Sequence, residues 1–520
     1  MFSKSLVTLS LLSPIASLPA IQLKQKSTGE RVFVETTDGR EVFFHGVNAI
    51  VKGYPYIPET EYFDIDISLS KEDHATLSDL GVNVYRLGSM WKGLEPTRGV
   101  YEQNYMDKLD QIVTEAEEYG IYTLLDMHQD DFSEKFCGEG VPDWAAIPSS
   151  TTSGDGFPYP LQEPFTDVST IDGFPTRQDC AKFNWPSYYN TKACGSAFEN
   201  LYTNVDGLLD SWANFWVEIV KKFDSRSSVL GVELINEPWA GDTVSNLKLL
   251  IPSYADKHML QPAYDYLATK IREVSNDILV FFAAVTWDDV IPNGFTNAPG
   301  GEQYADHSVF AYHYYEPPQF NEQIYFTTRL NDAKRLQTGS MLTEFERSDP
   351  TSGNTTDGFV ETADAADKFL QSWAMWEYKT FCKETEESLQ WDSQAAKFGS
   401  CKTGYGSHLI WSDDGTQNLD ASRKLARTYP QAVAGSTQSF KFDTTTGDFQ
   451  LVYIPTTTIT APTVIFAHQE LNYPTGMKVT ITPLGAATWK MGSSKNTIEI
   501  HVNSGKIQEN DRVVVKIQRK

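Results

Sequence analysis

The sequence predicts an α/β protein in which a (β/α)8 TIM barrel is followed by a small C-terminal antiparallel β-sandwich domain. Three observations predict this fold class. The chain has 520 residues, well beyond the roughly 250–300 residues at which one hydrophobic core stops growing. Short apolar runs alternate with helical periodicity from residue 41 to 430, which is typical of a parallel sheet with crossover helices. After residue 430, Thr, Val and Ile dominate and the helical periodicity disappears.

The barrel strands are predicted from eight apolar runs rich in Val, Ile, Tyr and Phe. These runs are Val42–Val47, Val82–Leu87, Tyr122–Met127, Val229–Ile235, Ile278–Phe282, Val309–Tyr312, Ser340–Thr343 and Trp373–Trp376. The segments predicted as helices between them are Gln103–Tyr119, Leu208–Phe223, Asp256–Ser275 and Phe326–Leu336. A doubly wound open sheet is the alternative, but no glycine-rich phosphate loop follows an early strand.

The predicted domains are a catalytic barrel over residues 21–430 and a β-domain over residues 431–520. A long insertion at about 132–207 follows the third strand, and long loops in compact domains are usually functional or disordered. We expect it to lie at the barrel mouth and to shape a cleft. Strands in the C-terminal domain are predicted at Phe449–Ile454, Thr463–Phe466, Lys478–Ile481, Thr497–Val502 and Arg512–Ile517.

Residues 1–20 are predicted to be a secretory signal peptide. Lys4 precedes an apolar stretch that ends in small residues, and the stretch is too short to span a bilayer. A buried N-terminal strand or helix is the alternative, which Pro14 and Pro19 disfavour. We therefore expect a secreted protein, in an extracellular or digestive setting, with a lysosomal one also open. No later segment is long and apolar enough to predict a transmembrane span.

The five cysteines fit an exported chain with two disulfides and one free thiol. Proximity in sequence favours the pairs Cys180–Cys194 and Cys382–Cys401, which leaves Cys137 free. Asn354 begins the sequon Asn-Thr-Thr in a polar stretch, which predicts N-glycosylation.

Composition excludes several classes of function. The net charge of −26 argues against nucleic-acid binding, which depends on basic patches. No HExxH or paired-cysteine spacing indicates a metal site, and no Gly-x-Ser-x-Gly elbow indicates a serine hydrolase. We therefore expect no metal.

Two carboxylates are the strongest candidates for chemistry. Glu237, in Asn236-Glu237-Pro238, ends the predicted fourth strand, and Glu344 ends the predicted seventh. Carboxyl ends of barrel strands face the active site, so the pair could flank one glycosidic bond as acid/base and nucleophile of a retaining glycosidase. Glu346 competes with Glu344, since the two would share a face of the strand.

Other polar residues also recur at predicted strand ends, although each could be an ordinary buried polar group. Arg86 and Tyr315 are expected to hydrogen-bond the nucleophile and keep it ionised. His128 and Asn236 are candidates for holding sugar hydroxyls, and Trp376 for stacking against a sugar ring. Asp130 and His313 complete the set of polar residues at strand ends.

These residues lie within stretches that resemble a known family. The stretches are Tyr85-Arg86-Leu87-Gly88, Glu95-Pro96-Thr97-Arg98-Gly99, Gly120–Asp130, Phe136-Cys137-Gly138-Glu139-Gly140, Pro142-Asp143-Trp144 and Arg427–Gly435. Together they resemble glycoside hydrolase family 5, in the retaining clan of barrel glycosidases, and within it most closely the endoglycoceramidases.

The resemblance implies hydrolysis of the linkage between oligosaccharide and ceramide in glycosphingolipids such as gangliosides, through a covalent glycosyl-enzyme and without a cofactor. It also implies a sugar-binding set around Glu237 and Glu344. This set comprises Lys52, His128, Asp130, Asn236, Tyr315 and Trp376. The alternatives are another family 5 β-glycosidase, cleaving glucosylceramide, sterol glucosides or β-glucan, and an inactive glycolipid-binding protein. A lipid substrate further predicts contact with a lipid surface through the barrel mouth and the C-terminal domain.

Overall fold

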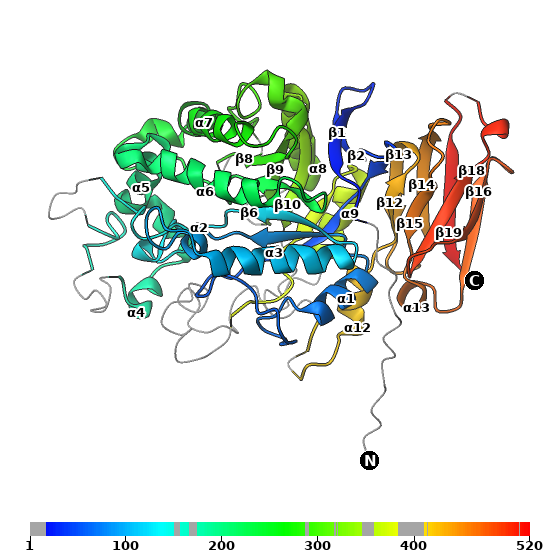
Figure 1. Ribbon diagram of the computed structural model, residues 1–520, viewed down its shortest axis with the longest axis horizontal. Helices are drawn as coiled ribbons and strands as arrows, with labels where there is room; N and C mark the ends of the chain where they lie inside the picture. Colours follow the sequence, from blue (N-terminus) through cyan, green and yellow to red (C-terminus); the bar gives the residue numbers. More distant parts are fainter. Residues whose placement is uncertain are drawn as a thin grey trace, which may run out of the picture.

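The computed structural model describes residues 17–149, 156–165, 174–285, 291–316, 319, 321–345, 358–382, 410–412, 414–508 and 510–520. Its larger part is a closed barrel of eight parallel strands, in the order β10-β11-β4-β5-β6-β7-β8-β9, surrounded by helices (Figure 1). The predicted (β/α)8 barrel is therefore confirmed. The C-terminal region folds into antiparallel strands beside it, as predicted.

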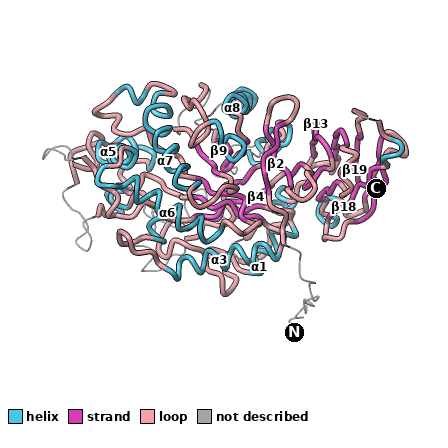
Figure 2. The backbone as a smooth tube through the Cα atoms, turned by 45° about the horizontal axis from the view of Figure 1, so that its top comes forward, coloured by secondary structure: helices cyan, strands magenta, loops and turns pink. Residues whose placement is uncertain are grey.

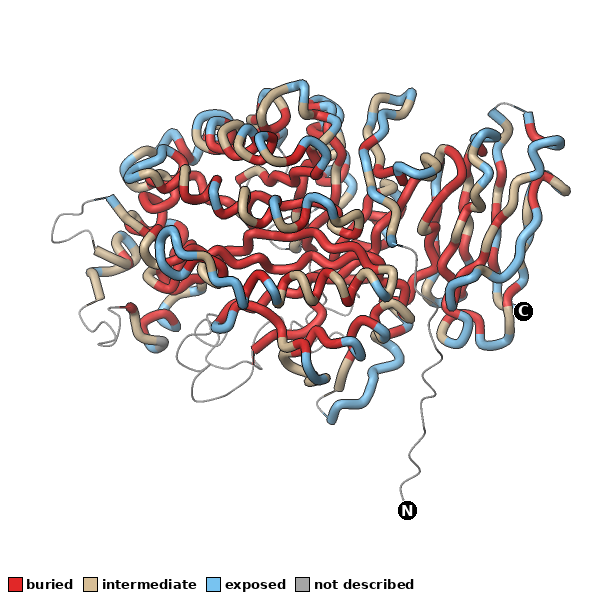
Figure 3. Tube along the Cα trace, in the orientation of Figure 1, coloured by how far each residue is buried: buried red, intermediate tan, exposed pale blue. Residues whose placement is uncertain are grey.

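The barrel strands are β4 (His45–Ala49), β5 (Val84–Gly88), β6 (Tyr122–Asp126), β7 (Val229–Glu233), β8 (Val280–Ala283), β9 (Ser308–Tyr314), β10 (Gly339–Phe345) and β11 (Trp373–Met375). These strands are buried almost throughout (Figure 3), because helices cover their outer side and side chains fill the interior.

The helices are α1 (Lys71–Asp79), α2 (Trp91–Leu94), α3 (Gln103–Glu118), α4 (Arg177–Cys180), α5 (Lys192–Tyr202), α6 (Leu208–Phe223), α7 (Gln261–Arg272), α8 (Glu322–Leu336), α9 (Gly358–Lys368), α12 (Leu419–Leu425) and α13 (Gln469–Asn472). Helix α6 shows why they form. Trp212, Phe215, Trp216, Ile219 and Phe223 recur at intervals of three and four residues and are all buried, so one stripe of the helix faces the barrel.

A prediction at the first strand needs correction. The run Val42–Val47 is not one strand, because β3 (Glu41–Val42) pairs antiparallel with a C-terminal strand whereas β4 begins at His45. The two residues between them point to different cores. Phe44 packs in the barrel interior, whereas the ring of Phe43 lies 5.0 Å from that of Phe440 in the C-terminal region. Sequence hydrophobicity alone does not reveal this change of sheet.

Two antiparallel sheets make up the C-terminal region. One has the order β13-β14-β19-β16, and the other β1-β2-β3-β12-β15-β18-β17. Their strands are β1 (Ile21–Gln25), β2 (Arg31–Glu35), β12 (Tyr429–Val433), β13 (Gly435–Phe442), β14 (Phe449–Pro455), β15 (Thr463–Phe466), β16 (Met477–Thr482), β17 (Ala487–Met491), β18 (Thr497–Val502) and β19 (Val513–Arg519). The N-terminal hairpin thus extends a C-terminal sheet, because β2 pairs with β3 and β3 pairs with β12. Figure 2 shows β2 between the barrel and the C-terminal strands. The predicted boundary at residue 430 stays a prediction.

The C-terminal region contacts the amino-terminal ends of the barrel strands. Leu23 of β1 and Phe33 of β2 pack with the residues that fill this end of the barrel interior. Tyr429 Oη donates to the carbonyl of Gly81, just before β5. The carboxyl ends of the barrel strands, where active sites of such barrels lie, are therefore at the opposite end from this domain.

The cysteine pairing corrects a second prediction. Cys137 forms a disulfide with Cys180, with 5.4 Å between their Cα atoms, so the predicted pair Cys180–Cys194 and the free Cys137 are both wrong. Cys194 is a buried free thiol on α5, with its Sγ 3.5 Å from the carbonyl oxygen of Asp131. Cys382 is disulfide-bonded, and its predicted partner Cys401 lies outside the described residues. Asn354 and Glu346 lie outside them too.

No helix among the described residues has the length and apolar character to cross a membrane.

Candidate active site

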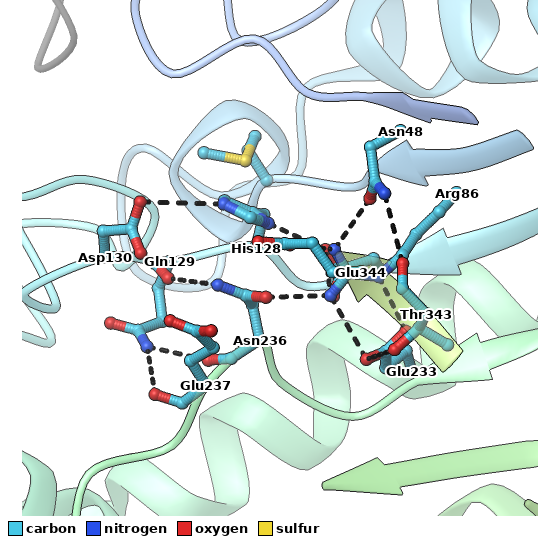
Figure 4. A network of polar contacts seen from close by, with 12 residues as sticks. Asn48, Arg86, His128, Gln129, Asp130, Glu233, Asn236, Glu237, Thr343 and Glu344 are labelled. Atoms are coloured by element: carbon cyan, nitrogen blue, oxygen red, sulfur yellow. Dashed lines mark hydrogen bonds and ion pairs between the residues drawn. The ribbon is translucent and has the colours of Figure 1, made fainter. Parts of the chain in front are cut away.

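Arg86 is the centre of a buried polar network at the carboxyl end of the barrel (Figure 4). It lies on β5, and its guanidinium group is surrounded by side chains from four other strands or the residues that follow them. Its partners are Glu233 Oε2 at 2.8 Å, Glu344 Oε2 at 3.0 Å, Asn236 Oδ1 at 2.9 Å, Asn48 Oδ1 at 2.9 Å and Asp126 Oδ2 at 3.1 Å.

The carboxylates around Arg86 favour its charged form. Burial by itself would lower the pKa of its guanidinium, but the neighbouring carboxylates of Asp126, Glu233 and Glu344 outweigh burial and raise it. A permanently charged planar group with fixed donors orients every acceptor around it. Arg86 therefore occupies the supporting position that the sequence predicts.

Glu344 ends β10 and is almost buried. One carboxylate oxygen accepts from Arg86, and the other accepts a short hydrogen bond from the hydroxyl of Tyr315. The register between β9 and β10 shifts between Leu342 and Glu344, which places Glu344 opposite His313. Burial raises the pKa of Glu344 despite the opposing effects of His313 and Arg86. Arg86 and Tyr315 thus favour the ionised form of Glu344, whereas burial opposes it.

Glu237 follows β7, and its side chain is 17% exposed at the mouth. His313 Nδ1 lies 2.9 Å from its Oε1. Burial alone would lower the pKa of His313, but the carboxylates of Glu344 and Glu237 outweigh burial and raise it. The two acids therefore favour the charged form of the imidazole, which is hydrogen-bonded to Glu237 and lies 3.9 Å from Glu344 Oε2.

The separation of the two acids is the decisive geometry. A carboxylate oxygen of Glu237 and one of Glu344 lie within 4.8 Å of each other. Retaining glycosidases place their two carboxyl groups about 5–5.5 Å apart, whereas inverting enzymes leave about 6.5–9.5 Å for a water molecule. The close approach of these two acids, which the sequence analysis selected from separate strands, favours the shorter, retaining separation.

A second cluster combines four of the predicted sugar-binding residues. The imidazole of His128 stacks on Trp376 with 5.4 Å between ring centroids, and Lys52 Nζ lies 4.7 Å from the centre of that indole. Lys52 also forms an ion pair with Asp130. Burial lowers the pKa of His128 to about 3, so its ring is neutral near pH 7. Of the two remaining members, Asn236 lies against Arg86 and Tyr315 donates to Glu344.

The site also contains residues that were not predicted to be functional, among them Asp126 and Glu233 beside Arg86. Glu139 lies 3.5 Å from Lys52 Nζ, Asn48 bridges Arg86 and the carbonyl of Thr343, and Gln129 lies behind Glu237. The two glycines that flank Glu139, Gly138 and Gly140, are a sequence signal that could have pointed to it. A Cβ at Gly138 would meet the carbonyl oxygen of Asp130 at 1.9 Å, and one at Gly140 that of His128 at 2.2 Å. Such close approach requires glycine.

Among the residues that the structure describes, two groups of side chains have ligand atoms close enough for a metal ion. They are His128 with Asp130 and Glu139, and Glu237 with His313 and Glu344. The ammonium group of Lys52 already lies among the acids of the first group. In the second, Glu344 already accepts from Arg86 and Tyr315. The expectation that the protein needs no metal stays a prediction.

A barrel with two acids at this spacing is the arrangement of a glycoside hydrolase. Residues 51–381 match the family described as "Cellulase (glycosyl hydrolase family 5)", and residues 427–517 match the "Glycoside hydrolase family 5 C-terminal domain". The chain belongs to glycoside hydrolase family 5 and is a glycosidase.

Two relatives narrow the family to its endoglycoceramidases. An endoglycoceramidase of Cyanea nozakii is 42% identical over 459 residues, covering 88% of this chain and 87% of that protein. One of Hydra vulgaris is 43% identical over 466 residues, covering 89% and 84%. The solved structure of endo-glycoceramidase II from Rhodococcus sp., as a lactosyl-enzyme intermediate, superimposes with a TM-score of 0.69 at 21% identity, covering 94% of this chain and 99% of that one. This last similarity shows the shared fold.

Proposed function

We propose that this protein is a retaining endo-β-glycosidase that hydrolyses the bond between the oligosaccharide and the ceramide of glycosphingolipids. The observation that carries the proposal is the approach of Glu237 and Glu344 within 4.8 Å at the barrel mouth. The endoglycoceramidase relatives support the choice of substrate. No residue of the described cluster requires a cofactor for this chemistry.

In the first step, Glu344 attacks the anomeric carbon as the bond to the ceramide oxygen breaks. Glu237 donates its proton to that oxygen, so the ceramide leaves as a neutral alcohol and a covalent glycosyl-enzyme forms. Arg86 and Tyr315 hold the attacking carboxylate in place. Because they donate to both of its oxygens, they also stabilise it when it leaves again as an anion.

In the second step, water attacks the anomeric carbon and Glu237 accepts its proton. The bond to Glu344 breaks, and the free oligosaccharide is released with its configuration retained. His313, hydrogen-bonded to Glu237, stabilises the anionic form of that acid between the two steps. The cluster of Lys52, His128, Asp130 and Trp376 supplies hydroxyl partners and a stacking face for the sugar.

The lipid contact that we propose lies at the barrel mouth. Leu247, Leu250, Ile251 and Ile291 are each at least 43% exposed and lie on the segments that follow β7 and β8. The hydroxyl of Ser253 donates to the carbonyl of Pro292 at 2.6 Å and joins these segments. We call these four side chains the mouth patch. An exposed apolar patch of this kind is typical of an interaction surface.

Replacing Leu250 and Ile251 together with Ser tests the role of the mouth patch. We expect activity on glycolipid in vesicles to fall by at least about tenfold, because full burial of even one such apolar side chain in lipid contributes about 1.5–3 kcal/mol. Activity on a soluble aryl lactoside should not change. The matched control is Leu484→Ser, since Leu484 is 98% exposed on the C-terminal domain. An equal loss in that variant would contradict the assignment to the mouth.

We also propose that the chain is exported. The disulfide between Cys137 and Cys180 supports this, since such bonds persist in oxidising compartments.

Mass spectrometry of the products from a mixed glycosphingolipid panel tests the substrate proposal. The expected products are an intact oligosaccharide and free ceramide, with cello-oligomers left intact. Release of single sugars, or cleavage of a glucan only, would favour another family 5 activity. No cleavage of any β-glycoside would favour the inactive glycolipid-binding alternative.

A further inference from the structure

The backbone of Glu237 has an unusual conformation. Its φ is +37°, a region that residues other than glycine rarely adopt and that persists only when surrounding structure enforces it. The side chain leaves the barrel wall from this turn and reaches His313. Whatever holds the turn therefore also sets the position of the carboxyl group.

Gln129 holds the turn. Its amide nitrogen donates to the carbonyl of Asn236 at 2.7 Å and to the carbonyl of Glu237 at 3.0 Å, as Figure 4 shows. In return, the side-chain amide of Asn236 donates to the backbone carbonyl of Gln129 at 3.0 Å. Gln129 is fully buried, and its own oxygen accepts from the backbone of Phe132 at 2.9 Å. Both ends of its amide are thus occupied.

The long insertion supports Gln129 from the other side. Tyr189 lies in the 3-10 segment Trp185–Asn190, and its hydroxyl accepts from the Gln129 amide at 3.3 Å. Its ring stacks on Trp239, two residues beyond Glu237, with 5.2 Å between centroids. The hydroxyl of Tyr202 on α5 donates to the carbonyl of Trp239 at 2.9 Å. The insertion thereby contacts Gln129 once and Trp239, two residues beyond Glu237, twice.

We propose that Gln129 and Tyr189 are positioning residues for proton transfer by Glu237, and that the insertion serves as the scaffold of the acid/base turn. This inference rests on the proposed function in one respect, since it takes Glu237 to be the acid/base. In this proposal, neither Gln129 nor Tyr189 contacts the substrate. Their effect passes through the backbone carbonyls of Asn236 and Glu237.

The inference predicts a selective defect. A loosened turn misplaces the carboxyl of Glu237 but leaves Glu344, held by Arg86 and Tyr315, unaffected. Leaving groups that need a proton should therefore suffer, while leaving groups that depart as stable anions should not. The value of kcat/KM reports the step that forms the glycosyl-enzyme. It should therefore fall for the first kind of leaving group and not for the second.

The test compares Gln129→Met with wild type on phenyl β-lactoside and on dinitrophenyl β-lactoside. We expect kcat/KM on the phenyl substrate to fall about 10- to 100-fold, because small misplacements of a catalytic group have effects of that size. On the dinitrophenyl substrate kcat/KM should stay within about threefold, since no proton is needed. Equal losses on both substrates would overturn the inference. So would no loss on either.

Gln371→Met is the matched control. Gln371 is also buried and makes side-chain hydrogen bonds with Tyr312 and Ser340, but it lies at the amino-terminal end of the strands. The Gln371→Met variant should lower stability by a similar amount. It should not change the ratio of kcat/KM on the phenyl lactoside to kcat/KM on the dinitrophenyl lactoside. Tyr189→Phe keeps the ring and removes the hydroxyl, so it should shift the ratio in the same direction by less. An unchanged ratio in Tyr189→Phe would remove Tyr189 from the proposal.

Failure of this inference and failure of the proposed substrate are distinguishable. If wild type cleaves the lactosides but leaves ceramide-linked glycans intact, the substrate proposal fails while the lactoside ratio still reports on Gln129. If the lipid is cleaved and the ratio does not change, only the inference about Gln129 fails.

Discussion

Two fully buried arginines occupy opposite ends of the barrel, and their surroundings differ in charge balance. At the mouth, Arg86 faces three carboxylates. At the amino-terminal end, Arg427 pairs with Asp367 at 2.9 Å and with Asp364, and Asp367 also lies 3.1 Å from His45. The rings of Trp373 and Tyr429 sandwich His45 and seal this second network.

The pKa shifts run in opposite directions at the two ends. At the mouth, burial raises the pKa of Glu344, and the neighbouring acids raise that of His313. At the sealed end, Arg427 and His45 outweigh burial and lower the pKa of Asp367, whereas burial lowers that of His45. A balanced, closed network stabilises the fold, while an acid-rich network that opens to a cleft keeps carboxylates reactive.

The largest expected effect comes from removing the carboxylates at the mouth. Glu344→Gln and Glu237→Gln should each lower kcat/KM on glycolipid by at least about 10³-fold, because each removes a group that acts in the transition state. The thermal midpoint should be retained, since Glu344→Gln removes a charge that burial disfavours. Thermal unfolding measured beside the kinetics checks both statements. Substantial activity in either variant would contradict the assigned roles.

The sealed end should show the reverse pattern. Arg427→Met leaves Asp367 without its main partner and should lower the free energy of unfolding by about 3–5 kcal/mol. The kcat of the remaining folded protein should not change, because Arg427 lies far from the mouth. Denaturant unfolding and kinetics on the same sample measure both. Arg423→Met, at an exposed position on α12, is the control and should change stability by less than about 0.5 kcal/mol.

The smallest expected effect is a contrast between two histidines. The folded pKa of His313 is raised above 6.5, so its contribution to stability is full below that pH and is lost as pH rises through the folded pKa. The folded pKa of His45 is lowered, so the unfolded state binds the extra proton and stability falls as pH drops below 6.5. His313→Gln should remove a loss of stability that occurs as pH rises, whereas His45→Gln should remove a loss that occurs as pH falls. Measuring the free energy of unfolding against pH for both variants checks this contrast. A change of the same sign in the pH dependence of both variants would contradict the contrast between the two histidines.

Much of the fold was predictable because strand and helix patterns are local. Eight apolar runs and the amphipathic stripe of α6 follow from periods of two and 3.6 residues. Val42–Val47 was not predictable as two strands, because Phe43 and Phe44 are equally apolar and only their partners differ. The addition of β1–β3 to a C-terminal sheet is likewise a contact between distant segments.

For the site, the sequence selected the two candidate acids and the two residues that hold Glu344, Arg86 and Tyr315, but not the residues that hold Glu237. Glu237, Glu344 and Arg86 stand at strand ends, and barrel geometry brings strand ends together. Gln129 and Glu139 contact loops from distant parts of the chain. The residues next to them in the sequence do not predict these contacts. Proximity in sequence likewise favoured Cys180–Cys194, but a disulfide requires Cα atoms about 4.4–6.8 Å apart. Only the packing of α4 beside the loop after β6 brings Cys137 to that distance from Cys180.

The amino-acid sequence alone was therefore sufficient for the barrel and the family and for the selection of the two candidate acids, because each depends on local patterns or on strand order. The separation of the acids, the disulfide pairing and the clamp on the Glu237 turn depended on tertiary structure. The physical reason is that these features are distances between segments far apart in the chain, and side-chain packing determines such distances.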